Sequence, residues 1–103
     1  MNTAMCDPNW QTWVSRWDRM QERYLVARSE HFDIIARLIA DTQTPVRNIV
    51  DLGCGTGTLT VSLLEKFPLV HTYGLDLDPT LLPLAHARSS IFADRTHFLQ
   101  ADL

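Results

Sequence analysis

The feature that most constrains this chain is a short apolar segment that runs directly into three closely spaced glycines. Residues 48–58 read Asn-Ile-Val-Asp-Leu-Gly-Cys-Gly-Thr-Gly-Thr, with the glycines at positions 53, 55 and 57. Glycine adopts positive φ values at little cost, and it has no Cβ atom to collide with a ligand. The stretch therefore predicts a strand, a tight turn and a ligand site beside the turn backbone.

Strand and helix patterns alternate on the C-terminal side of this turn. The apolar spacing of residues 59–67 predicts a helix that Pro68 ends or closely follows, and residues 70–76 and 96–100 read as strands. A strand, a crossover helix and a second strand within about thirty residues form a parallel βαβ unit. The predicted fold class is therefore α/β with parallel strands.

One more helix is predicted between the second and third strands, and Pro83 constrains where it begins. If Thr80 is the N-cap, Pro83 takes the third helical position, where its missing N–H group loses no hydrogen bond. If Asp78 is the N-cap, Pro83 lies deeper and one bond is lost. We therefore predict the Thr80 start, and we assign Asp78, which precedes Pro79, to turn geometry.

Two helices are predicted before this α/β unit. Apolar residues of the first recur every three or four positions, which is the spacing of one helix face: Trp10, Trp13, Val14, Trp17, Met20 and Tyr24. The second begins at about Ser29, as its N-cap, and ends between residues 41 and 45. No glycine or proline separates the two, so one bent helix is the alternative to a break near Arg28.

The organisation of the chain changes near Thr44, from helices alone to alternating strands and helices. We therefore divide it into an N-terminal helical segment, residues 1–44, and a sheet-containing segment, residues 45–103. The tryptophan-rich face of the first helix is expected to pack against the sheet-containing segment as core.

Composition and charge narrow the class of protein. A chain of 103 residues with 46% hydrophobic and 20% charged residues is typical of one small globular domain. Nine basic against twelve acidic residues give a formal net charge of −3, without the basic patch of a nucleic-acid-binding protein. No apolar run approaches the length of a membrane span, so we expect a cytoplasmic protein without a membrane partner.

Cysteine and histidine give no sign of a metal site. Cys6 and Cys54 are the only cysteines, and the four histidines are scattered without metal-ligand spacing. Cys54 lies inside the glycine turn, where a small side chain can be accommodated. No histidine can be placed beside it to activate it as a nucleophile, so we do not assign it that role.

Carboxylates follow the predicted strands. The carboxyl ends of parallel strands open on one crevice, where ligands bind, so Asp51, Asp76 and Asp102 should converge beside the glycine turn. Asp76 lies about twenty residues after the glycines, where it can accept hydrogen bonds from both hydroxyls of a ribose. For Asp102 a solvated strand end is the alternative.

The glycine spacing differs from that of a dinucleotide turn. Such a turn reads Gly-x-Gly-x-x-Gly, but here the third glycine comes one residue early, at Gly57, and Thr58 takes its position. Asp51, just before the glycines, would repel a phosphate and favour an ammonium or sulfonium group. A cationic nucleoside is therefore the predicted ligand.

Three motifs together resemble the class I S-adenosylmethionine-dependent methyltransferases. They are Val-Asp-Leu-Gly-Cys-Gly-Thr-Gly at residues 50–57, Tyr-Gly-Leu-Asp at 73–76 and Phe-Leu-Gln-Ala-Asp at 98–102. The resemblance covers residues 47–103. It implies a Rossmann-like fold with strand order 3-2-1 in this part, S-adenosylmethionine as the cofactor, and methyl transfer as the activity.

The resemblance also implies roles for individual residues. In the family, the positions that match Asp51 and the glycines border the methionine part of the cofactor. The position matching Asp76 holds the ribose hydroxyls, and the one matching Asp102 accepts a hydrogen bond from the adenine amino group. N-terminal helices cover the cofactor in many small-molecule members, which makes Trp17 and Tyr24 candidate lid residues. The implied cofactor-binding set is Asp51, Gly53, Cys54, Gly55, Gly57, Asp76, Leu77 and Asp102.

A complete enzyme of this family has a seven-stranded sheet, so the resemblance implies that these three strands are part of a truncated domain. The first strand is then an open sheet edge, through which self-association is expected. The catalytic residues stay unknown, because the family's acceptor-site residues usually follow the fourth strand. The expected acceptor is a small molecule.

Two other functions remain open. One is an enzyme with a related nucleoside site, such as an aminopropyltransferase or an NAD-type oxidoreductase. The other is a non-catalytic module that binds a cofactor, or a partner through its aromatic helices.

Overall fold

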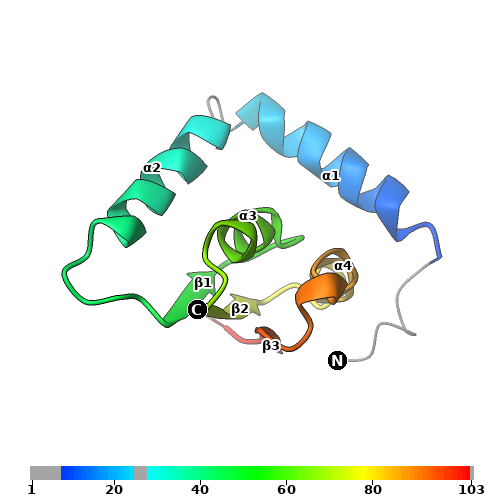
Figure 1. The fold of residues 1–103 in the computed structure, drawn as a ribbon. Helices are drawn as coiled ribbons and strands as arrows, with labels where there is room; N and C mark the ends of the chain where they lie inside the picture. The colour runs from blue at the N-terminus through cyan, green and yellow to red at the C-terminus, as the bar shows by residue number, and fades with distance from the viewer. Residues whose placement is uncertain (1–7, 25–27, 103) are drawn as a thin grey trace.

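The computed structural model describes residues 8–24 and 28–102. Its elements follow the predicted order (Figure 1): α1 (Trp10–Tyr24), α2 (Arg28–Ala40), β1 (Asn48–Leu52), α3 (Thr58–Lys66), β2 (His71–Asp76), α4 (Leu82–Arg88), the 3-10 turn η2 (Ser90–Phe92) and β3 (Thr96–Gln100). The predicted break near Arg28 adjoins residues 25–27, which lie outside the described residues, as does Cys6. The division at residue 44 stays a prediction.

The three strands form one parallel sheet in the order β1-β2-β3. Leu52 pairs with Leu75, and Leu75 with Leu99, so the carboxyl ends of the strands lie at the same edge. The α/β class and the adjacent parallel strands are therefore confirmed. β1 pairs only with β2, which leaves its other side open among the described residues.

The molecule is built in three layers (Figure 1). Helices α3 and α4 cover one face of the sheet, and α1 and α2 lie across them as an outer layer that we call the roof. The core lies between the sheet and the α3–α4 layer, because the apolar side chains of these elements interdigitate there. Its most completely buried members are Leu63, Leu64, Val70, Leu82 and Ala85.

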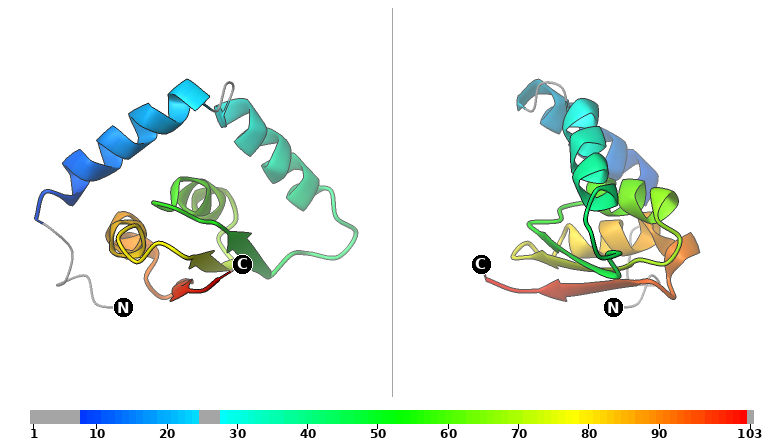
Figure 2. Two further views of the ribbon diagram at one scale, coloured as in Figure 1. Left: turned by 180° about the vertical axis from the view of Figure 1, so that it is seen from behind. Right: turned by 60° about the vertical axis from the view of Figure 1, so that its left-hand side comes forward.

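No described helix lies against the other face of the sheet, as the two views of Figure 2 show. Side chains on successive strand residues alternate between the two faces, and every second residue of β1 is exposed. Val50, Leu52 and Leu99 are each 58–64% exposed. The described residues therefore leave an apolar sheet face in contact with solvent.

Arg95, just before β3, closes the C-terminal end of α3. Its guanidinium group donates hydrogen bonds to the carbonyl oxygens of Leu64, Phe67 and Val70 at 2.9–3.1 Å. The last carbonyls of a helix lack intrahelical partners and carry partial negative charge. One cation from just before β3 therefore bonds the carbonyls at and just beyond the end of α3, at a distance along the chain that no local sequence signal reveals.

Two predicted helix starts are wrong. α4 has Leu81 as its N-cap, not Thr80, because Thr80 donates from its backbone N–H and its hydroxyl to the Asp78 carboxylate at 2.9 and 2.7 Å. Because Thr80 takes part in this short-range turn, the helix begins after it. Pro83 therefore falls within the first two helical positions. The assignment of Asp78 to a turn is confirmed. Ser29 lies inside the first turn of α2, which begins at Arg28.

The tryptophan-rich face of α1 packs less completely than predicted. Val14 is 7% exposed and is therefore buried beneath α1, but Trp13 is 48% and Met20 is 49% exposed. The covered face of α1 runs along Trp10, Val14, Trp17 and Gln21, and Trp13 and Met20 lie beside it. The helix is confirmed, whereas burial of the whole aromatic face is not.

None of the helices in residues 8–24 and 28–102 combines the length and the hydropathy needed to cross a lipid bilayer.

Candidate functional site

The turn between β1 and α3 contains three positive-φ residues, Gly53, Gly55 and Gly57, at φ 72°, 57° and 81°. The backbone N–H groups of Gly53 and Cys54 donate to the carbonyl oxygen of Leu75 at 2.7 and 3.1 Å, which fixes the turn to the end of β2. A Cβ atom added at Gly53 would meet nothing within 4 Å. The backbone there faces open space that a ligand could enter.

Asp76, the last residue of β2, points back to this turn. Its Oδ2 accepts a hydrogen bond from the backbone N–H of Gly55 at 2.8 Å, and its Oδ1 accepts one from Asp78 at 2.9 Å. A carboxylate has about four acceptor positions, so two remain for ligand hydroxyls. The backbone bonds hold the carboxylate in one orientation without using up its capacity.

Asp51 lies on β1, one residue before the turn begins, and it is half-buried. The hydroxyl of Thr60, on α3, donates to its Oδ2 at 3.0 Å. Burial raises the pKa of Asp51 above its ordinary value; the Thr60 hydrogen bond opposes this, and the nearby charge of Asp76 adds to it. The buried negative charge is therefore short of compensation, and a cationic ligand would supply it.

Replacing Asp51 with asparagine should raise the thermal midpoint of the ligand-free protein at neutral pH. With its pKa raised, the folded state binds more protons than the unfolded state, so stability falls as pH rises above about 4. Asparagine can still accept the Thr60 bond and removes this loss. Thermal melts of both proteins between about pH 4 and pH 7 measure the difference.

Asp78→Asn is the matched control for that experiment. Hydrogen bonds from the side chain and then the backbone of Thr80 lower the pKa of the exposed Asp78 carboxyl. A lowered pKa contributes stability that is present at neutral pH and lost on acidification, so this variant should melt lower at pH 7. The account of Asp51 is contradicted if both variants shift the midpoint in the same direction.

A cavity of about 440 Å³ lies between the turn and the roof. Its floor comes from the predicted site residues Asp51, Gly53, Cys54, Gly55 and Asp76. A volume of this size is within the usual range for small-molecule sites. The glycine turn and both carboxylates therefore open on one space, as the parallel topology predicts.

Trp17 supplies part of the roof over this cavity. A Cβ atom added at Gly55 would lie 3.7 Å from Trp17 Nε1, so the indole rests against the turn. This position is the one that a lid residue needs, and the lid role itself stays a prediction. Tyr24 ends α1, but its side chain lies outside the described part of the structure.

Three predicted site residues do not line this cavity. Leu77 is 59% exposed, and Asp102 is exposed after the end of β3. Gly57 faces α4: a Cβ atom there would lie 3.3 Å from the Cβ of Ala85. The third glycine thus permits close contact between the start of α3 and α4. The ligand-binding roles of these three residues stay predictions.

Cys54 is buried beneath the turn, and burial, followed by the negative charges of Asp51 and Asp76, raises the pKa of its thiol to about 12. At pH 8 only about one thiol in ten thousand is then ionised. In a Cys6→Ser background we expect negligible reaction of the folded protein with a disulfide reagent at pH 8, and full reaction in urea. Reaction of the folded protein at the rate of an exposed thiol would contradict this.

Several roof residues of the cavity were not identified from the sequence. They come from both roof helices: Gln21, Arg28, His31, Phe32 and Ile35. In α2 their spacing of three and four marks one helix face, which is the signal that could have found them. That signal does not separate a ligand-facing stripe from a core-facing one. Within the described residues, no group of three or more His, Cys, Asp or Glu side chains is arranged to hold a metal ion.

Comparison with known proteins identifies related sequences. Residues 49–103 match the family model described as "Methyltransferase domain". Trans-aconitate 2-methyltransferase of Acidovorax sp. (strain JS42) is 38% identical over 89 residues, which are 84% of this chain and 32% of that enzyme. Carboxy-S-adenosyl-L-methionine synthase of Campylobacter lari is 29% identical over 90 residues, 87% of this chain and 38% of that enzyme. The chain spans about a third of the length of these relatives.

Solved structures share the fold. The methyltransferase domain of bacterial CtHen1-C superposes with a TM-score of 0.61 at 22% sequence identity, over 70% of this chain and 39% of that one. YjhP from E. coli superposes with a TM-score of 0.57 at 23% identity, over 71% of this chain and 29% of that one. At these identities the likeness supports the Rossmann-like arrangement of strands and helices, and nothing finer.

Proposed function

Because this chain belongs to the class I S-adenosylmethionine-dependent methyltransferases, we propose that it supplies the cofactor-binding part of an enzyme that methylates a small molecule. When bound, the cofactor supplies a methyl group on a positively charged sulfur atom. Protein catalysis of such a displacement is mainly positioning and electrostatics. The task of the described residues is therefore to hold the cofactor in one orientation.

The observation that carries this proposal is the shared cavity. Asp51, Asp76 and the open backbone at Gly53 line the same space of about 440 Å³. Asp76 has free acceptor positions for ribose hydroxyls, and Asp51 presents a negative charge that favours a sulfonium or ammonium group. A phosphate-containing dinucleotide would meet two carboxylates instead.

A small acceptor is supported from two sides. The chain carries a net charge of −3 with no basic run, which disfavours a nucleic acid. Trans-aconitate, named in the relative from Acidovorax, is a small molecule.

Calorimetric titration of this chain tests the proposal. S-adenosylmethionine and S-adenosylhomocysteine are expected to bind at one site, and NAD is not. Binding of NAD alone would overturn the proposal in favour of an oxidoreductase. Preference for decarboxylated S-adenosylmethionine would favour an aminopropyltransferase, and binding without turnover of any acceptor by a longer form would favour a non-catalytic module.

We also propose that isolated copies of this chain associate through β1. The unpaired side of β1 presents backbone N–H and C=O groups that another strand can pair with. Sedimentation velocity over a range of concentrations is expected to show reversible dimers. A monomer at all concentrations would contradict it.

A further inference from the structure

Few apolar side chains of the roof are fully buried. Among the described residues of α1 and α2, Val14 and Ala36 are the only buried hydrophobic side chains. The larger inward-facing apolar side chains of the roof, such as Trp17, Phe32 and Ile35, are only half-buried, so the hydrophobic stabilisation of the roof is modest. Polar contacts between the roof and the layer below therefore have a large share in deciding whether the cavity is covered.

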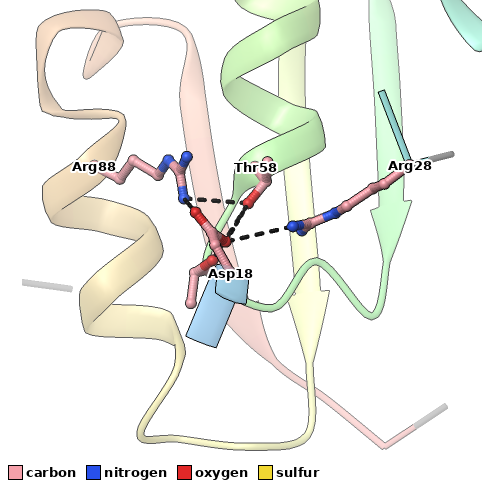
Figure 3. Close-up of polar contacts among 5 residues, drawn as sticks. Asp18, Arg28, Thr58 and Arg88 are labelled. Carbon is pink, nitrogen blue, oxygen red and sulfur yellow. Dashed lines mark hydrogen bonds and ion pairs between the residues drawn. The ribbon is translucent and has the colours of Figure 1, made fainter. Parts of the chain in front are cut away.

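One carboxylate makes most of these contacts. Asp18, on α1, accepts hydrogen bonds from the Arg88 guanidinium at 2.9 Å and the Thr58 hydroxyl at 3.1 Å, and its Oδ1 lies 3.5 Å from Arg28 Nη1. Arg88 also donates to the Thr58 hydroxyl oxygen at 3.1 Å. Figure 3 shows these four residues converging from α1, α2, α3 and α4. We call them the Asp18 cluster.

The charge of Asp18 suits the ends of the helices beneath it. α3 begins after Gly57, has no side-chain cap and carries no acidic residue in its first turn. The partial positive charge at a helix N-terminus favours a nearby anion, and Asp18 lies beside Thr58, the first residue of α3. Arg88 belongs to the last turn of α4, where a cation is favoured.

The Asp18 cluster is partly shielded from water. The side chains of Asp18, Arg28 and Arg88 are 22%, 19% and 24% exposed. A second ion pair between the roof and the layer below joins Asp33 of α2 to Lys66 of α3, and these side chains are 64% and 42% exposed. Screening by water and salt weakens exposed pairs most, so the two contacts should differ in strength although both join the roof to the layer below.

Two roof residues of the cavity connect it to the Asp18 cluster. Trp17, the neighbour of Asp18 in α1, rests against the glycine turn, and Arg28 both lines the cavity and contacts Asp18. We propose that Asp18 is a positioning residue that holds the roof closed over the cofactor, and with it Trp17 and Arg28. This inference rests on the proposed function only for the identity of the ligand.

Tryptophan fluorescence tests the closure without any ligand. The three tryptophans of the chain all lie in α1, so their emission reports the roof alone. Asp18→Asn keeps the size of the side chain and removes its charge. We expect acrylamide quenching and hydrogen exchange of α1 to rise in this variant, with the exchange of α3 and β2 unchanged. Asp33→Asn is the matched control and should change neither.

Ligand affinity tests the consequence. The dissociation constant for S-adenosylhomocysteine rises by the inverse of the fraction of molecules with a closed roof. We expect a rise of about tenfold, which corresponds to a closed roof in about one variant molecule in ten. Combining Asp18→Asn with Arg88→Met should weaken binding no further than Asp18→Asn alone, because both remove the same contact. Asp33→Asn should leave the dissociation constant unchanged.

The outcomes separate this inference from the proposed function. If the unaltered chain does not bind S-adenosylhomocysteine, the proposed function fails, while quenching and hydrogen exchange still decide the role of Asp18. Unchanged quenching in Asp18→Asn would overturn the inference. Increased exchange throughout α3 and β2 would overturn it as well, because Asp18 would then stabilise the whole fold and not the roof.

Discussion

Replacing Asp76 with alanine is expected to weaken the binding of S-adenosylhomocysteine by about 1–3 kcal/mol, or roughly 5- to 150-fold in the dissociation constant. The substitution removes the acceptor for the ribose hydroxyls. It also leaves the N–H groups of Gly55 and Asp78 without their present partner, which loosens the turn that faces the ligand. Calorimetric titration of the variant gives the change directly.

Asp94→Ala is the control for this variant. Asp94 is an exposed aspartate that precedes β3, at the opposite end of the sheet from the cavity. The Asp94→Ala substitution removes the same formal charge as Asp76→Ala, so a general electrostatic effect on binding would appear in both variants. Unchanged affinity in Asp76→Ala would mean that the ligand site lies elsewhere.

The second large effect is expected at Gly57. Alanine there must adopt a φ of 81°, at a cost of about 1–2 kcal/mol, and its Cβ would lie 3.3 Å from that of Ala85. Separating α3 from α4 to relieve this contact adds about 1–3 kcal/mol. Urea unfolding should therefore show a loss of about 2–5 kcal/mol in Gly57→Ala.

Gly53→Ala separates the two contributions. Its φ of 72° imposes similar backbone strain, but its Cβ would meet nothing within 4 Å. We expect a loss of only about 1–2 kcal/mol in the free energy of unfolding. Equal losses in the two variants would show that close packing of α3 on α4 contributes nothing at Gly57.

The sequence was sufficient for the parts of the fold that depend on neighbouring residues. The glycines at 53, 55 and 57 and the alternation of apolar strands with helices predict β1, α3 and β2 in the right places. β3 occupies residues 96–100, as predicted. Asp51 and Asp76 could be placed at one crevice because parallel strands share a carboxyl edge.

The predictions that were wrong or incomplete include the start of α4 and the burial of the tryptophan-rich face of α1. Both Thr80 and Asp78 are residues that cap helices, and the turn they form together decides that neither starts α4. The tryptophans of α1 have the spacing of a buried face, but spacing gives no information on how much of a helix is covered by the layer below.

The Asp18 cluster lay beyond sequence reasoning for a different reason. Thr58 lies 40 positions from Asp18 along the chain, and Arg88 lies 70 positions from it. Each is an ordinary polar residue in its own helix. Only the way the roof crosses α3 and α4 brings them together. Apart from Trp17, the residues on the roof side of the cavity were missed for the same reason.

The bonds from Arg95 to the end of α3 have a consequence for the order in which this chain folds. Until residue 95 has left the ribosome, the carbonyl groups of Leu64, Phe67 and Val70 lack the guanidinium donor that they share in the folded chain. The βαβ unit is thus completed by a residue that follows it in synthesis. In pulse-labelled refolding, protection of the last turn of α3 should appear together with that of β3, and earlier protection of α3 would refute this order.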